Sequence, residues 1–371
     1  MEQVHIIEER QKVSVIPKYQ IVVNWIKDKI YNNELGPGDK LESENELSQR
    51  FGISRQTVRH GINILEREGL IESRQGSGSY VSNFLMNKKK GSRNIVIVST
   101  YLGEYIFPNI IEGMERVLSE AGYGIQISFT HNQVENERKV LRRILDEMDV
   151  EGVIVEPTKS GLPNPNLEIY NEIVKKKVPV LFFNSYYPGL DLPHVCLDDR
   201  RAGYMATNHL LELGHRKIAG IFKSDDGQGR LRYQGYLDAL MEKGIHLKDE
   251  HIIWIDTEDE KTLVKDDKRV LRRLRGCTAC VPYNDTIAYA VETICLRNNI
   301  KIPKDLSIAS IDNSELAKLC EVPVTSVVHP TGQLGERAAK YMLELIKDSS
   351  FDATYEYKPE ICVRDSCRRL E

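Results

Sequence analysis

Apolar positions follow a strand-and-helix rhythm through most of the chain. From residue 94 onward, short continuous apolar runs alternate with stretches in which apolar residues recur at helical spacing. A continuous run is expected of a strand buried on both faces, and such alternation predicts a parallel sheet. The expected strands are 95–98, 125–127, 152–155, 180–183, 218–222, 252–255, 278–282, 306–311 and 324–328. The expected helices are 108–121, 134–146, 167–176, 231–243, a charged helix ending at 275, and 285–298.

The length of this alternating region predicts the domain organisation. A length of 371 residues accommodates about two to three domains. Roughly 275 residues of strand and helix are too many for one small sheet, so a body of two doubly wound α/β lobes is expected. The predicted division is a leader at 1–16, a helical head at 17–83, a basic linker at 84–93 and the body at 94–371.

The head shows a helix-turn-helix pattern. Ser43 followed by Glu46 is a capping box that begins one helix, and Gly52 can end it because glycine enters a left-handed turn cheaply. Ser54 then caps a second helix, on which apolar residues at 58, 62 and 65 face inward. An amphipathic helix over 17–33 precedes the pair. Two short strands, at 70–72 and 79–81, follow the pair of helices and flank a tip of glycine and serine.

The second helix carries Arg55, Gln56 and Arg59 near its N-terminus, on the side away from the apolar residues. A recognition helix places its base-reading side chains there. Arginine can bond guanine bidentately, and glutamine can bond adenine in the same way. The tip Gln75-Gly76-Ser77-Gly78 has little bulk, so it can enter a minor groove or lie along the phosphates. The competing interpretation is an ordinary small helical domain with a surface hairpin.

This head resembles the winged-helix head of the GntR family of bacterial regulators. The resemblance rests on Pro17-Lys18-Tyr19 and the segments 35–41, 43–47, 54–59, 65–71 and 75–78. It implies DNA contacts from the helix-turn-helix and the wing. The candidate DNA-binding residues are Lys18, Glu44, Ser54, Arg55, Gln56, Thr57, Arg59, Gln75, Gly76, Ser77 and Gly78.

Charge limits the kind of DNA binding that is expected. The net charge of −4 argues against a generally basic coat. From 17 to 83, nine Lys and Arg balance nine Asp and Glu, and Lys88, Lys89, Lys90 and Arg93 make the segment through 93 positive. Such a run is usually a solvated tether. Affinity for double-stranded DNA would then come from a local patch that neutralises phosphates.

Cysteines and hydropathy indicate a simple intracellular protein. The seven cysteines are scattered, and Cys277 and Cys280 lack a second pair at matching spacing. Buried free thiols are therefore expected rather than a metal or redox site, and no cofactor is expected. We find no signal peptide and no apolar run long enough to span a membrane, so we expect a cytoplasmic protein without a membrane partner.

Hydrogen-bonding residues follow the predicted body strands. Ligands of doubly wound sheets bind at the carboxyl ends of the strands, where this chain carries Tyr101, Glu156, Asn184, Lys223, Asn284, Asp285, Asp312 and His329. There is no phosphate-binding glycine loop among them. Such side chains suit a neutral polyol. Singly, Asp285 could cap its helix, Glu156 could lie in a solvated turn, and Asp312 could form an Asx turn. Their shared position favours a ligand cleft.

The body resembles the effector-binding body of the LacI/GalR family. The resemblance rests on the segments 198–204, 209–219, 232–236, 283–288, 302–308 and 325–327. It implies two lobes, similar to periplasmic sugar-binding proteins, that close on a sugar. The implied sugar-binding positions are Arg232, Asn284, Asp312 and His329. The LacI-type head and hinge helix are absent, and Ser310-Ile311-Asp312-Asn313 replaces a more usual Gly-aromatic-Asp-Asp run.

A GntR-like head on a LacI-like body resembles the arabinose-responsive repressors of Bacillus and its relatives. The segments 100–108, 151–160 and 222–229 carry this resemblance and add Tyr105 and Asp226 to the candidate sugar contacts. It implies L-arabinose as effector. We therefore expect a non-enzymatic, homodimeric repressor that leaves its operator when L-arabinose binds between the lobes. The alternatives are another pentose or hexose, sugar as a corepressor, a sugar-binding transport component, or an enzyme.

Overall fold

The computed structural model describes residues 18–31, 34–36, 38–67, 70–74, 77–82, 94–101 and 105–370. Its contacts divide the chain into two compact units, residues 1–90 and 91–371, which we call the head and the body. The predicted leader, the predicted linker and the wing residues Gln75 and Gly76 lie outside the described residues. No helix within the described ranges has the length and apolar character that crossing a membrane demands.

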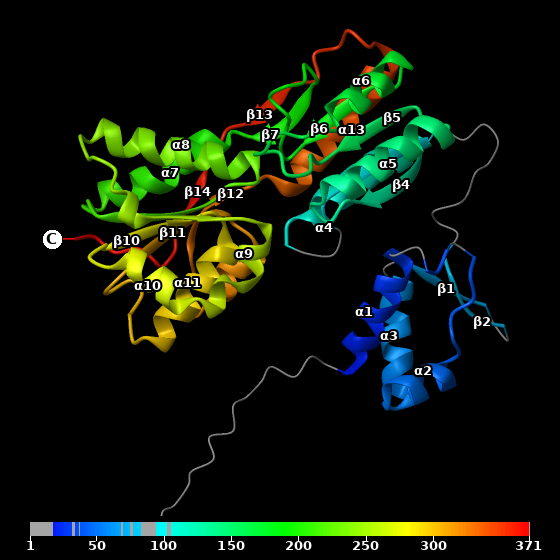
Figure 1. Ribbon diagram of the computed structural model, residues 1–371, viewed down its shortest axis with the longest axis horizontal. Helices are drawn as coiled ribbons and strands as arrows, with labels where there is room; N and C mark the ends of the chain where they lie inside the picture. The colour runs from blue at the N-terminus through cyan, green and yellow to red at the C-terminus, as the bar shows by residue number, and fades with distance from the viewer. Residues whose placement is uncertain are drawn as a thin grey trace, which may run out of the picture. The chain divides into compact units, whose positions relative to one another are not determined.

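The head consists of helices and a hairpin in the predicted order (Figure 1). The elements are α1 Lys18–Tyr31, α2 Glu44–Phe51, α3 Arg55–Arg67, β1 Ile71–Arg74 and β2 Gly78–Val81. The two strands pair antiparallel, with Ile71 opposite Val81. One apolar core joins all three helices to the hairpin, and it includes Ile26 of α1, Leu47 of α2 and Leu65 of α3.

Local hydrogen bonds form the predicted helix-turn-helix. The Ser43 side chain accepts from the Glu46 backbone N–H at 3.3 Å, and Glu46 accepts from the Ser43 N–H at 2.7 Å. Gly52 adopts φ 61°, in the left-handed region. Ser54 Oγ accepts from the Thr57 N–H at 3.2 Å and so begins α3. The predictions of the capping box, the glycine turn and the second cap are confirmed.

The body contains two lobes, each built on a six-stranded sheet. Lobe one has the strand order β13-β7-β6-β5-β3-β4, and every neighbouring pair is parallel. Its elements are β3 Asn94–Ser99, α4 Phe107–Glu120, β4 Gly124–Phe129, α5 Val134–Glu147, β5 Gly152–Val155, α6 Leu167–Lys175, β6 Val180–Phe183, β7 His194–Leu197, α13 Thr331–Lys347 and β13 Tyr355–Tyr357.

Lobe two has the strand order β14-β12-β11-β10-β8-β9. Its strands are parallel except for β14, which pairs antiparallel with β12. Its elements are α7 Asp199–Glu212, β8 Ile218–Lys223, α8 Gly227–Glu242, η2 Asp249–His251, β9 Ile252–Ile255, α9 Thr257–Thr262, η3 Leu263–Lys265, α10 Asp267–Leu274, β10 Ala279–Pro282, α11 Asp285–Arg297, β11 Ser307–Asp312, α12 Glu315–Leu319, β12 Thr325–Val328 and β14 Ile361–Cys362.

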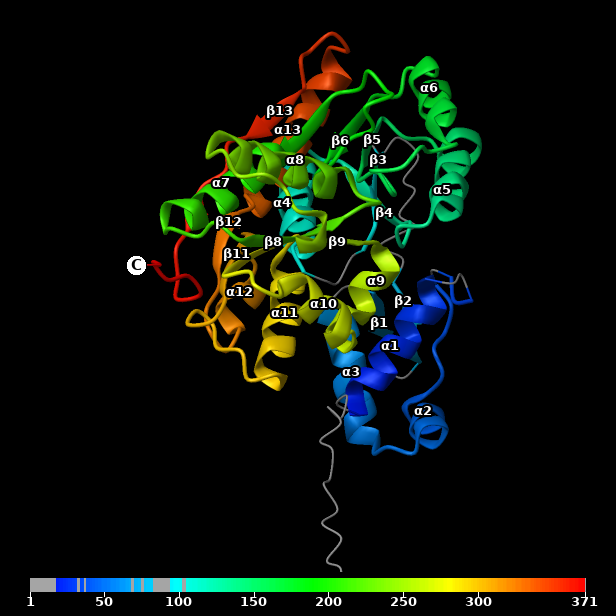
Figure 2. The same cartoon turned by 60° about the vertical axis from the view of Figure 1, so that its left-hand side comes forward.

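Helices cover both faces of each sheet, which explains the continuous apolar runs. In β3, Ile95 and Ile97 pack towards α4 and α13, whereas Val96 and Val98 pack towards α5 and α6. Figure 2 shows α5 and α6 side by side on their face of the first sheet. In lobe two, α7 and α8 cover one face, and α10 and α11 cover the other. The doubly wound, two-lobed prediction is confirmed.

The chain passes between the lobes three times, after β7, after β12 and after β13. Of the elements at these crossings, β12 was predicted at 324–328, whereas β7, α7, α13, β13 and β14 were not predicted. The antiparallel β14 also makes the second sheet mixed rather than purely parallel. The cleft between the lobes is therefore bridged by segments far apart in the sequence.

Two predicted helices have different bounds in the structure. Helix α8 begins at Gly227 rather than at residue 231. Gly229 lies so close to β8 that an added Cβ would meet the Lys223 carbonyl oxygen at 2.0 Å, so the glycine serves close packing and is not a loop signal. The prediction of a single charged helix that ends at residue 275 is wrong. Asp256 caps α9 and Asp266 caps α10, with η3 between them.

Candidate functional site

The head exposes the predicted recognition surface at the start of α3. Arg55, Gln56 and Arg59 are all exposed, while Val58 between them is fully buried. Arg59 donates two hydrogen bonds to Glu44 of α2, at 2.8 Å from Nε and 2.7 Å from Nη2. These bonds lower the pKa of the Glu44 carboxyl. Arg55 Nη2 lies 3.8 Å from the same carboxylate. Both helices therefore contribute charge to one surface.

The other candidate DNA-binding residues have mixed positions. Thr57 and Ser54 bond each other through their hydroxyls at 2.8 Å, so part of their capacity serves the helix start. Lys18 is exposed at the first position of α1. Gly78 opens strand β2, and Ser77 precedes it in the turn, where its hydroxyl lies 2.7 Å from Tyr80 Oη. Contact with DNA stays a prediction for each of them.

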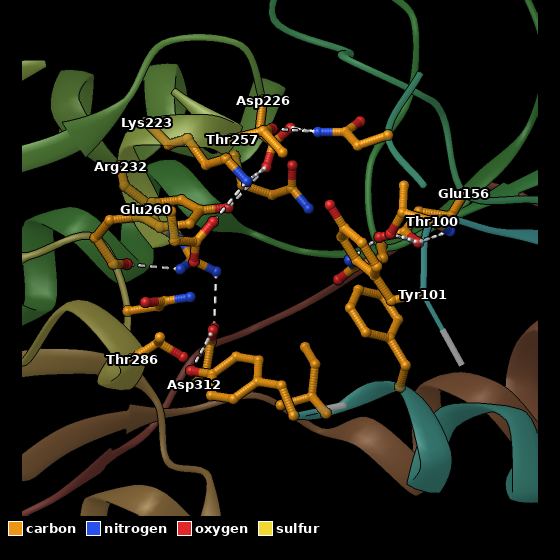
Figure 3. A pocket seen from close by; sticks show the side chains of 18 of the residues that line it. Thr100, Tyr101, Glu156, Lys223, Asp226, Arg232, Thr257, Glu260, Thr286 and Asp312 are labelled. Carbon is orange, nitrogen blue, oxygen red and sulfur yellow. Dashed lines mark hydrogen bonds and ion pairs between the residues drawn. The ribbon is translucent and has the colours of Figure 1, made fainter. Parts of the chain in front are cut away.

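A cavity of ≈ 250 Å³ lies between the lobes of the body (Figure 3). It is smaller than the roughly 300–1,000 Å³ typical of pockets for drug-sized ligands, so its size suits a small molecule. Nine of the eleven predicted sugar-binding residues line it: Tyr101, Tyr105, Glu156, Asn184, Lys223, Asp226, Arg232, Asn284 and Asp312. Asp285 and His329 are not among the lining residues.

Arg232 forms the centre of the wall from lobe two. Its guanidinium donates to Asp199 Oδ1 at 2.7 Å, to Asp312 Oδ1 at 2.8 Å and to the Tyr283 carbonyl at 2.8 Å. Its side chain is only 3% exposed, so these bonds form in a dry environment. Burial raises the pKa of the Asp199 carboxyl to about 6 against the pull of Arg232. The guanidinium is thus held in one orientation at the cavity.

Tyr105 connects the two lobes at this wall. The side chain comes from lobe one, and its hydroxyl donates to Asp312 Oδ2 at 2.8 Å and accepts from the Asp285 N–H at 3.1 Å. Tyr105 adopts φ 61° and Asp312 adopts φ 103°, both in the left-handed region that non-glycine residues rarely enter. Strained backbone of this kind is concentrated at functional sites.

Asp285 supports the cleft from behind its wall. Its carboxylate accepts from the Ser314 N–H at 2.7 Å and from Ser326 Oγ at 2.7 Å. The helix cap that it could have supplied comes instead from Asn284, whose Oδ1 accepts from the Ile287 N–H at 3.0 Å. The Asx-turn alternative for Asp312 also gives way to its bonds with Arg232 and Tyr105.

Glu156 lies on the opposite wall and is 5% exposed, which contradicts the solvated-turn alternative. Its carboxylate accepts from the Thr100 N–H at 2.8 Å and from Asn184 Nδ2 at 3.0 Å. Burial raises its pKa, and the hydrogen bonds from Thr100 and Asn184 oppose that rise. His329 Nε2 lies 3.0 Å from Asn184 Oδ1. Burial lowers the pKa of His329 to about 4, so the neutral imidazole can donate to Asn184 and orient it.

Lys223 contributes a cation to the wall of the cavity. Its ammonium lies 2.9 Å from Asp226 Oδ2 and 2.9 Å from Glu260 Oε2. Burial alone would lower the pKa of this ammonium, but the two carboxylates raise it well above its ordinary value. Tyr101, Ile106, Phe107 and Pro157 add apolar surface from lobe one. Polar groups facing apolar ones match the hydroxyls and C–H faces of a sugar.

The lobes also touch beside the cavity. Asn132 of lobe one donates to Thr257 Oγ1 at 2.6 Å and to Asp226 Oδ1 at 3.3 Å, both in lobe two. The Gly227 N–H donates to Ser160 Oγ at 2.9 Å. A ligand in the cavity would therefore be enclosed by both lobes at once.

The cysteines are not among the residues that line the cavity. Cys277 and Cys280 are buried free thiols, as predicted, and burial raises the pKa of Cys277 to about 11. Within the described ranges, no group of three or more His, Cys, Asp or Glu could hold a metal ion.

Two family models match the chain. The model for bacterial regulatory proteins of the gntR family matches residues 18–81, which are the head. The model for the periplasmic binding protein-like domain matches residues 207–367 of the body. The predicted family of each unit is confirmed.

Two relatives match almost from end to end. An arabinose metabolism transcriptional repressor of Halalkalibacterium halodurans is 38% identical, over 94% of this chain and 96% of the relative. One of Geobacillus stearothermophilus is 34% identical, over 97% of this chain and all of the relative. The chain belongs to this repressor family. It is thus a transcriptional regulator with a gntR-type head.

A solved structure agrees on the fold of the body. The crystal structure of the transcription regulator CcpA of Lactococcus lactis is 24% identical, with a TM-score of 0.67, and covers 75% of this chain and 100% of its own. At this identity the likeness establishes the fold of this family member and no more.

Sequence reasoning missed several cavity residues in this repressor. Thr100, Asn132 and Thr257 each lie shortly after a strand, so the strand-end rule could have found them. Glu260 lies within helix α9, and Gln228 lies in the first turn of α8. Neither position follows a strand directly, so the rule gave no signal for them.

Proposed function

We propose that this repressor binds L-arabinose between the lobes of its body and that the sugar releases it from operator DNA. The observation that carries the proposal is the convergence of Arg232, Asn284 and Asp312 with Glu156 and Lys223 on one small interlobe cavity. Hydroxyl groups both donate and accept, so they can pair with these carboxylates, amides and cations. The names of the two relatives support arabinose among small sugars.

The sugar acts by favouring the closed arrangement of the lobes. Tyr105 and Asn132 already reach across the cleft, and a bound sugar adds hydrogen bonds to both walls. A ligand shifts a conformational equilibrium only by its difference in affinity for the two states. Closure is therefore the step that sugar binding can drive.

DNA binding uses a homodimer whose two heads occupy adjacent half-sites about one helical turn apart. Closure of the lobes changes the geometry of the dimer, so the heads no longer fit both half-sites. The coupling is reciprocal: operator DNA weakens sugar binding by the factor by which sugar weakens DNA binding, typically ~5–150-fold. We assign the cleft a binding role without turnover, in a cytoplasmic protein.

The test is binding of the full chain to DNA from upstream of its own gene, at fixed salt, with and without L-arabinose. Tight binding that the sugar releases supports the proposal. Tight binding without an arabinose effect contradicts the sugar assignment and leads to a panel of other pentoses and hexoses. Binding no tighter than to random DNA contradicts the operator assignment.

A further inference from the structure

The cations that line the cavity are already paired with carboxylates. Three cations line it, Lys223, Arg232 and Lys261, together with four carboxylates, Glu156, Asp226, Glu260 and Asp312. Arg232 lies between two carboxylates, at 2.7 and 2.8 Å. Lys223 also lies between two, each at 2.9 Å. Lys261 pairs with Glu258 at 3.0 Å. A ligand therefore meets cations whose charge is balanced from within the protein.

The opposite wall adds negative charge. Glu156 is buried, and its carboxylate is held by the neutral donors Ser99, Thr100 and Asn184. In Figure 3, Glu156 and Thr100 lie across the cavity from the group of Lys223, Asp226, Glu260 and Arg232. An anionic ligand would approach Glu156, or it would have to displace a carboxylate from Lys223 or Arg232. Both cost free energy in a partly dehydrated site.

A neutral hydroxyl meets no such penalty. It can donate to Glu156, Glu260 or Asp312, and it can accept from the ammonium N–H groups of Lys223 that remain. The paired cations and the additional carboxylate of Glu156 therefore favour an uncharged polyol over an anion of the same size.

We propose that this cleft selects uncharged sugars against sugar acids and sugar phosphates, and that Glu260 is a specificity-determining residue for this selection. The inference rests on the proposed function and adds the charge of the ligand as a basis of selection. Glu260 reaches Lys223 from α9 and is 21% exposed. Asp226, by contrast, makes two further contacts, with Asn132 of lobe one and with Tyr283. Changing Glu260 therefore removes one of the two carboxylates that balance Lys223, and it leaves the interlobe contact of Asp226 in place.

The experiment compares two sugars that differ in charge. D-Galactose and D-galacturonate share the ring stereochemistry of L-arabinopyranose and differ only at C6, a hydroxymethyl group in one and a carboxylate in the other. Their Kd values are measured by calorimetry on the full chain at constant ionic strength. L-Arabinitol and L-arabinonate form a second, pentose-sized pair with the same difference in charge.

The wild-type chain should bind the neutral member of a pair at least 100-fold more tightly than the anion. In Glu260→Gln, the ratio of anion Kd to neutral Kd should fall at least tenfold. The matched control is Asp259→Asn on the same helix, which removes one charge from a residue paired with Arg269 instead of a cavity cation. This control should leave the ratio unchanged.

A wild-type chain that binds an anion within tenfold of its neutral match overturns the proposal. So does a Glu260→Gln chain whose ratio equals that of the wild type, or to which no anion binds. Equal effects of Glu260→Gln and Asp259→Asn would also overturn it, because overall charge would then explain the change. Failure of L-arabinose to bind the wild type is a separate result, which removes the arabinose assignment and leaves the charge ratios to be judged on their own.

Discussion

Arg59 and Glu44 are joined across the helix-turn-helix by two hydrogen bonds, 2.8 and 2.7 Å long. A bidentate arginine–carboxylate pair fixes the guanidinium in direction as well as in place. The pair lies beside Arg55, on the exposed surface that we predict to face DNA. Glu44 therefore orients one arginine and also lowers the positive charge of the surface that we predict to contact DNA.

Replacing Arg55 should cost sequence-specific binding energy. Arg55 is exposed at the start of α3, where base edges are read. In Arg55→Ala we expect a loss of about 1–3 kcal/mol on the operator, confined to the base pair that Arg55 contacts. Binding is measured on operators substituted one base pair at a time. A loss of equal size on every sequence would instead identify Arg55 as a phosphate contact.

Replacing Glu44 should strengthen binding to random DNA and lower the preference for the operator. Glu44→Gln removes one negative charge beside Arg55 and Arg59, so affinity for random DNA should rise and its salt dependence should steepen. Operator affinity should fall relative to random DNA because Arg59 loses its orientation. Filter binding over a salt series measures both. The matched control is Glu42→Gln, which frees Arg50 of α2 instead; an identical effect would show that charge alone matters.

Removing the hydroxyl of Tyr105 should weaken sugar binding. Tyr105→Phe keeps the ring and deletes the bridge from lobe one to Asp312 and Asp285 in lobe two. A hydrogen bond to a charged group contributes about 1.5–3 kcal/mol, so the Kd for L-arabinose should rise roughly tenfold or more. Calorimetry on the full chain measures this Kd. An unchanged Kd would mean that the bridge does not contribute to closure.

Removing Arg232 should abolish the sugar response and leave DNA binding intact. Arg232→Ala deletes the guanidinium that organises Asp199, Asp312 and the Tyr283 carbonyl. It also leaves two buried carboxylates unpaired, which typically costs 3–5 kcal/mol, so the melting temperature of the body should fall as well. Operator binding titrated with L-arabinose measures the response. A variant that still releases DNA with wild-type sensitivity would contradict the assignment of the cleft.

The sequence predicted the layers of the fold better than their edges. Ile95 to Val98 form an unbroken apolar run because both faces of β3 are covered, and such runs are easily recognised. Helix α7 was not predicted, because its close packing on α8 requires glycine at the contact. An added Cβ at Gly203 would meet the Arg232 carbonyl oxygen at 2.1 Å, and one at Gly235 would meet that of Arg200 at 1.8 Å. Glycines required for close packing resemble helix breakers in a sequence.

The cleft was predictable where one rule applied. Glu156, Asn184, Lys223 and Asp312 lie at or just after the ends of strands, so topology alone brought them together. The same rule could not separate a lining residue from one behind the wall, and His329 lies behind Asn184. The strand-end rule also gave no signal for Glu260, because this residue lines the cavity from within a helix. Tertiary placement of helices decides such positions, and no local pattern records it.

Asp285 should make the stability of the body depend on pH between about 4 and 6. Burial, with the charge of Asp312, raises its pKa from 3.8 to about 6. The folded state therefore binds the proton more tightly than the unfolded state, so stability falls as pH rises through this window and is level above it. The shift corresponds to about 3 kcal/mol. Asp285→Asn lacks this term, so the free energy of unfolding of wild type minus variant should drop by up to that amount from pH 4 to pH 7. Urea unfolding followed by Trp254 fluorescence in a Trp25→Phe background reports on the body, and a difference that rises with pH would contradict the assigned direction.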